Sequence, residues 1–231
     1  MNFIDTIKTL QIHNISNCVK RRRIIKACDE TIKINLDSVD IIRKTIDDTE
    51  KAIHNWQNDN ENNKHQALIK AFQVCSNLYE LSGKFFLIEL DVRTAFKFLF
   101  KANTDYEYRF FVRRIYTLMY ETKKGLAIPT GTIYKELALL IDNDSLADYK
   151  NAHQKLVRFL DAHQAELKNV RNRNEAHKTE QFKIQLASIE QLSVSKSIDL
   201  IEEYSSYLYH LNSCFMNVLI SLSKCINSLR K

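Results

Sequence analysis

Apolar residues recur at helical spacing along most of the chain. An isoleucine or valine returns every seven residues between positions 25 and 53, and Cys28, Ile42 and Trp56 follow members of that series by three positions. This heptad pattern predicts a coiled-coil-like helix of about four heptads, roughly 50 Å long at about 1.5 Å per residue. Asn35 and Thr49 interrupt the apolar seam.

A polar run at 58–63 follows this helix and predicts a reversal of the chain. The return helix should start near Lys64, with one apolar face that alternates by three and four positions as far as Phe86. Gly83 should break or kink it. We therefore predict an N-terminal helical hairpin over residues 1–82.

Residues 83–231 continue with helical patterns, and no segment shows the period-two alternation of a strand. Thr104 lies in a good stop and N-cap signal before a helix at 106–121. Residues 123–131 hold two of the three glycines and the only proline, which predicts a long loop. One amphipathic stripe from Tyr149 to Val170 and a last helix capped by Ser195 complete the pattern. The predicted fold class is all-α, a multi-helix bundle preceded by the hairpin.

Composition narrows the functional classes only slightly. The net charge is +6 with a pI of about 9.0, which permits an anionic partner such as nucleic acid. The five cysteines are odd in number and form no CxxC pair, so neither a zinc site nor a disulfide framework is expected, and a reducing cytoplasm fits best. The sequence shows neither a signal peptide nor a membrane-length apolar run. We expect a cytoplasmic protein with no membrane association.

The stretch 171–177, Arg-Asn-Arg-Asn-Glu-Ala-His, carries the strongest chemical signal. A guanidinium holds phosphate through a fork of N–H donors, and an imidazole transfers protons near neutral pH. Because asparagine favours caps and turns over helix interiors, we expect the helix to break near Asn172–Asn174 and bring Arg171 and His177 together. In a continuous helix Arg173 would instead share a face with His177.

This stretch resembles the signature of HEPN domains, an arginine and a polar residue followed within a few positions by histidine. The order of its residues is most similar to that in HEPN proteins of bacterial abortive-infection systems. The likeness to the rest of the domain, roughly residues 84–228, is one of helical pattern, and residues 1–82 resemble no family that we can name. The resemblance implies an HEPN-like bundle over 83–231 that forms a homodimer with a shared cleft.

The resemblance also implies a metal-independent endoribonuclease without a cofactor. Arg171 would orient the scissile phosphate, Asn172 would position the pair, and His177 would act as general base or acid. Glu175 either orients the imidazole or is simply solvated. The implied setting is a toxin–antitoxin or phage-defence system, with RNA as substrate and an antitoxin, for example a nucleotidyltransferase, as a regulatory partner.

Charge and aromatic residues near the motif add weaker signals. Segment 150–183 carries eight basic and four acidic side chains, and Arg173, Lys168 and Lys178 are its candidate RNA contacts. An aromatic set between 106 and 120 has the spacing of a core but also the chemistry of base stacking. His153 and His163 fall on an apolar stripe and are expected to be packed rather than metal ligands. A catalytically inactive helical module that binds RNA or protein is the alternative function.

Overall fold

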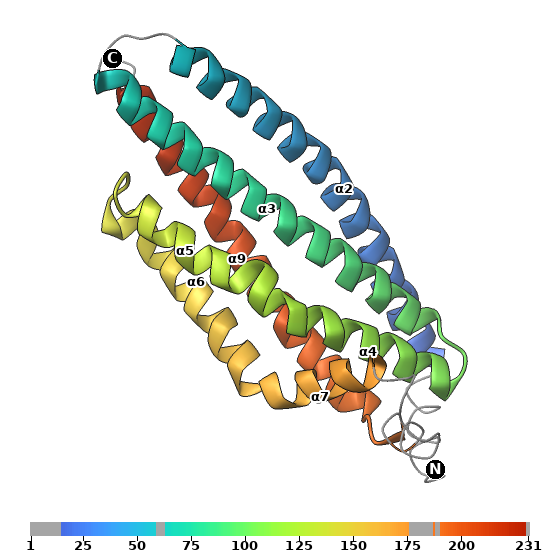
Figure 1. The fold of residues 1–231 in the computed structure, drawn as a ribbon. Coiled ribbons are helices and arrows are strands. Elements are labelled where there is room, and N and C mark those ends of the chain that lie inside the picture. Colours follow the sequence, from blue (N-terminus) through green and yellow to red (C-terminus); the bar gives the residue numbers. More distant parts are fainter. Residues whose placement is uncertain (1–14, 59–62, 176–186, 188–189, 230–231) are drawn as a thin grey trace.

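The computed structural model describes residues 15–58, 63–175, 187 and 190–229, and within them every regular element is a helix (Figure 1). The predicted all-α class is confirmed. The long helices run side by side along one common direction, and the shorter α7 lies at one end of the bundle (Figure 1). The elements are α2 (Ile15–Asn58), α3 (Asn63–Lys101), α4 (Asp105–Thr122), the π-helix η1 (Lys123–Ala127), α5 (Ile128–Leu137), α6 (Asn143–Ala162), α7 (Gln164–Glu175) and α9 (Val194–Leu229).

Helices α2 and α3 lie side by side as a hairpin at the N-terminal end, and α2 packs almost entirely against α3. The buried positions on α2 are Cys28, Asn35, Ile42 and Thr49, spaced by seven, whereas the isoleucine and valine series is only half-buried. The two polar residues that interrupt the sequence pattern therefore lie on the seam itself. This is a register-setting arrangement known from coiled coils.

Arg21 closes the hairpin at the end away from its turn. Its guanidinium donates hydrogen bonds to the carbonyl oxygens of Phe100 and Ala102, which mark the C-terminal end of α3. Carbonyls in the last turn of a helix have no partner within the helix, so a cation there satisfies them and also favours the helix dipole. Arg21 is thus a structural capping residue.

The prediction of a break at Gly83 is wrong, because α3 runs uninterrupted from Asn63 to Lys101. A Cβ at Gly83 would meet Ile42 Cγ2 at 3.5 Å, an ordinary contact, so the glycine imposes no bend there. The predicted division of the chain between residues 82 and 83 falls inside this helix. The hairpin and the following bundle therefore share α3 as a common element.

The prediction of a loop at 123–131 is also wrong. The chain continues from α4 through η1 into α5 without leaving helical conformation. Leu126 and Ala127 are completely buried and hold this segment in the core, and Pro129 follows in the first turn of α5, directly after η1. A Cβ at Gly131 would lie 3.0 Å from the His153 ring, so a larger residue there would require the ring to shift by a few tenths of an ångström.

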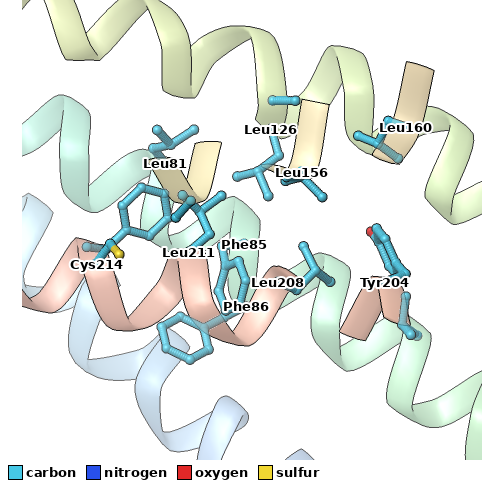
Figure 2. Close-up of a cluster of buried hydrophobic side chains, with 14 of the residues drawn as sticks. Leu81, Phe85, Phe86, Leu126, Leu156, Leu160, Tyr204, Leu208, Leu211 and Cys214 are labelled. Atoms are coloured by element: carbon cyan, nitrogen blue, oxygen red, sulfur yellow. The ribbon is translucent and has the colours of Figure 1, made fainter. Parts of the chain in front are cut away.

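The core lies where α3, η1, α6 and α9 meet. Figure 2 shows buried side chains of all four elements gathered in one cluster, with the Phe85 ring of α3 beside Leu208 and Leu211 of α9. Tyr204 of α9 is fully buried, and its hydroxyl lies 2.5 Å from the Thr122 hydroxyl at the end of α4. Across the described ranges, no helix is both long and apolar enough to cross a membrane.

Candidate functional site

The helix that leads to the motif is not the single helix that the sequence predicts. It is interrupted at His163, where α6 ends and α7 starts. Lys123 bridges the interruption, with Nζ 2.6 Å from Asp161 Oδ1 and 3.0 Å from Gln164 Oε1. Beyond the break, α7 packs mainly on α4 rather than on α6. The break therefore determines which helix the motif faces.

The predicted break at Asn172–Asn174 is wrong, because α7 continues through these residues to Glu175. Leu167 is 1% exposed and Val170 is packed against the core, so their burial against α4 outweighs the low helix propensity of asparagine. At about 100° per residue, positions 171 and 173 lie on nearly opposite sides of α7. Only one of the two arginine positions can therefore face α4.

Arg171 occupies the position that faces α4. Its Nε lies 3.3 Å from Glu121 Oε1, and its guanidinium carbon lies 5.6 Å from the centre of the Tyr120 ring. The side chain is 32% exposed, so the cation is partly shielded and held by a carboxylate and an aromatic face. Such a guanidinium has a fixed orientation and stays partly accessible to a ligand from solvent.

A buried polar junction lies beside Arg171 at the meeting of α4, α7 and α9. The Tyr116 hydroxyl lies 3.0 Å from Ser197 Oγ and 3.5 Å from Glu166 Oε1. Burial raises the pKa of Tyr116 to about 12, so its hydroxyl stays protonated at neutral pH. Glu166 also lies 3.9 Å from His163 Nδ1. These groups fix α7 against its neighbours.

A second anchored cation, Arg109, lies on α4. Its Nε is 2.7 Å from Asp105 Oδ2, and its Nη1 donates to the carbonyl oxygens of Glu190 and Leu192. The Arg109 side chain is 8% exposed and that of Asp105 is 23% exposed, which makes this a partly buried, hydrogen-bonded ion pair. Through these bonds, Arg109 holds the chain that precedes α9 against α4.

The other candidate residues of the motif lie along α7 and beyond its end. Asn172 and Lys168 are exposed on α7, while Arg173 and Glu175 belong to the same helix. His177 and Lys178 lie outside the described residues, so whether His177 meets Arg171 or Arg173 stays a prediction. Two contact residues of Arg171 were missed by sequence reasoning, because nothing local in the sequence links Tyr120 and Glu121 to a residue on α7.

Metal and proton-transfer groups elsewhere give no competing site in the described ranges. His153 is packed as expected, with Nε2 2.8 Å from the Ala127 carbonyl oxygen. The His163 ring centre lies 4.9 Å from that of Phe159. Among the residues that the structure describes, no group of three or more His, Cys, Asp or Glu side chains is arranged to hold a metal ion.

Comparisons with protein-family models, with curated proteins and with solved structures give no match. The HEPN resemblance therefore remains a hypothesis that rests on the motif, and the candidate site stands on its own geometry.

Proposed function

We propose that this chain is a metal-independent endoribonuclease of the HEPN type, an effector of a bacterial toxin–antitoxin or phage-defence system. The observation that carries the proposal is the setting of Arg171. A motif arginine that is oriented by an aromatic face and a carboxylate, and that stays partly accessible, is suited to receive one phosphate in a defined position.

The proposed reaction is an internal transfer at phosphorus. The 2′-hydroxyl oxygen attacks the adjacent phosphate, a bond from O2′ to phosphorus forms, and the bond from phosphorus to O5′ breaks. His177 takes the proton from the 2′-hydroxyl or gives one to the departing O5′, while Arg171 stabilises the charge on the phosphate oxygens. The products are a 2′,3′-cyclic phosphate and a free 5′-hydroxyl.

A second copy of the chain would supply what one copy lacks. Each chain contributes one motif histidine, and the proposed transfer needs both a base and an acid. A homodimer that brings two motifs together provides both groups. A regulatory antitoxin, for example a nucleotidyltransferase, is part of the same proposal. The proposal also includes a cytoplasmic location, which is supported by free thiols at Cys28, Cys75, Cys214 and Cys225.

The test compares RNA cleavage by matched variants of the full chain. His177→Ala should lower the cleavage rate by about 10²–10⁴-fold, and Arg171→Ala should also abolish most activity. His210→Ala and Arg158→Ala serve as controls, because both alter exposed residues on other helices. Wild-type cleavage by His177→Ala would refute the proposal.

The alternative is a catalytically inactive helical module that binds RNA or protein. The long hairpin favours it, because α2 exposes Ile34 and Ile41, 63% and 67% accessible, on a helix that packs almost entirely against α3. Ile34 and Ile41 are seven positions apart and so share one face of α2, and exposed apolar side chains that form a contiguous patch are typical of interaction surfaces. RNA binding without cleavage, unaffected by His177→Ala, would favour this alternative.

A further inference from the structure

The aromatic residues of α4 divide between the core and the surface. Tyr108 and Tyr116 are 6% and 1% exposed and belong to the core, as their spacing predicts. Tyr106 and Phe110 are 59% and 49% exposed. Single exposed apolar side chains are ordinary, whereas a contiguous exposed group indicates a contact surface, so the question is whether these rings belong to such a group.

Phe110 belongs to an exposed cluster that links α4 to α3. Phe98 of α3, 43% exposed, stacks on Phe111 with ring centres 5.7 Å apart and an interplanar angle of 18°. Phe110 meets Phe111 edge to face at 5.2 Å. The cluster is therefore a rigid aromatic platform whose outer rings remain accessible.

Cations border the platform. Lys101 Nζ, at an exposed position, lies 5.7 Å from the centre of the Phe98 ring. Arg113 lies 6.0 Å from the centre of the Phe110 ring, but it is only 7% exposed and donates to the Arg109 carbonyl oxygen. Lys101 and the exposed Arg114 are therefore the cations that a ligand can reach. The carboxylates at the start of α4 are already engaged, since Asp105 pairs with Arg109 and Glu107 accepts the backbone N–H groups of the helix cap. Cations beside open rings favour an anionic ligand that carries flat aromatic groups.

The platform continues toward Arg171 along one face of α4. Phe110, Arg114, Thr117 and Glu121 follow one another by four, three and four positions, so they share a face of the helix. Arg114 is exposed, and Glu121 holds Arg171. At about 1.5 Å per residue this strip is about 16 Å long, and it joins aromatic rings at one end to the motif arginine at the other.

We propose that this strip, from Phe98 and Phe110 through Arg114 to Arg171, binds single-stranded RNA. Bases stack on the phenylalanine platform, and the phosphates pass Arg114 and reach Arg171. Only unpaired bases expose the faces that stacking requires, so duplex RNA is excluded from the platform. The choice of RNA over DNA rests on the proposed function, whereas the stacking platform rests on the cluster itself.

The test measures binding of a short, unstructured, fluorescein-labelled RNA by anisotropy, with His177→Ala as the background so that the probe stays intact. Phe110→Ala should weaken binding about tenfold, as expected for loss of one stacked base. Phe110→Leu keeps the apolar volume and should weaken binding similarly. Phe110→Trp should retain affinity and show quenched tryptophan fluorescence when RNA is added. Tyr209→Ala, which removes an exposed aromatic ring from α9, should leave affinity unchanged.

An abasic oligonucleotide of equal length separates stacking from charge, because it keeps the phosphates and lacks the bases. It should bind wild type and Phe110→Ala equally weakly.

The proposal is overturned if no RNA binds, if the abasic probe binds wild type as tightly as RNA does, or if Phe110→Ala binds like wild type. It is also overturned if Phe110→Ala only converts a dimer to a monomer in sedimentation velocity. Cleavage that does not depend on Phe110 refutes the strip alone. Phe110-dependent binding without cleavage refutes the ribonuclease alone.

Discussion

Arg171 of α7 is paired with Glu121 of α4, with Nε and Oε1 3.3 Å apart. The cation that the motif offers to phosphate therefore already has an anionic partner within the chain. A phosphate that binds Arg171 must share or displace this carboxylate. The pair holds the guanidinium in place and at the same time lowers its attraction for RNA.

Removal of the Glu121 charge should strengthen RNA binding. Glu121→Gln keeps the size of the side chain but deletes the negative charge next to Arg171, so one more cation is available to the phosphate backbone. We expect a several-fold higher affinity at low salt and a steeper dependence on salt concentration, measured by anisotropy titrations. Glu136→Gln on α5 is the control. If Glu121→Gln binds RNA with unchanged affinity, then Arg171 does not contribute to RNA binding.

Arg109 should be a major contributor to stability. Its side chain is buried, and its ion pair with Asp105 and its hydrogen bonds to two carbonyl groups are partly shielded from solvent, so Arg109→Met leaves a carboxylate and two carbonyls without this partner. We expect a loss of about 1–3 kcal/mol in the free energy of unfolding, measured by urea denaturation. Arg114→Met, an exposed change on the same helix, should cost well under 1 kcal/mol. Similar losses in both variants would contradict the structural role of Arg109.

Stability should fall at high pH in a way that depends on Tyr116. Burial raises its pKa from the ordinary tyrosine value of 10.0 to about 12, so the folded state keeps a proton that the unfolded chain loses. The contribution is complete below about pH 10 and is lost as the pH rises toward 12, on the order of 2–3 kcal/mol. Tyr116→Phe should make the decline between these pH values shallower in denaturation experiments. Tyr106→Phe, at an exposed ring, should not change its slope.

Asn35 should reduce the stability of the hairpin. Its side chain is 3% exposed, and within the described part of the chain its Nδ2 makes no hydrogen bond. A buried amide nitrogen of this kind costs about 1–3 kcal/mol. Asn35→Leu should therefore raise the free energy of unfolding by about 1–2 kcal/mol, whereas Asn55→Leu, at an exposed position of α2, should have little effect. A destabilised Asn35→Leu would show that the amide has a partner in solution.

Local sequence signals predicted those parts of the fold that depend on local physics. The cap at Thr104 was predicted correctly. Its hydroxyl accepts a hydrogen bond from the Glu107 backbone N–H, and the Glu107 carboxylate accepts one from the Thr104 backbone N–H. The heptad pattern likewise predicted α2 and its pairing with α3, because a largely apolar seam along a helix must be buried against a partner.

The errors arose where tertiary packing outweighed local propensity. Glycine and proline at 125–131 indicated a loop, but buried Leu126 and Ala127 hold the segment in a helix. Conversely, the break at His163 carries neither glycine nor proline, and the break expected at the motif asparagines does not occur. The contact between Arg171 and Glu121 joins two helices distant in sequence, so no local sequence pattern predicts it.

The chemistry of the RNA ends tests the central claim most directly. Purified wild-type protein is incubated with single-stranded RNA in excess EDTA, and the ends of the fragments are identified by mass spectrometry. We predict fragments with 2′,3′-cyclic phosphate and 5′-hydroxyl ends, lost together in Arg171→Ala and His177→Ala. Intact RNA, or fragments ending in 3′-hydroxyl and 5′-phosphate, would contradict a metal-independent ribonuclease at this site.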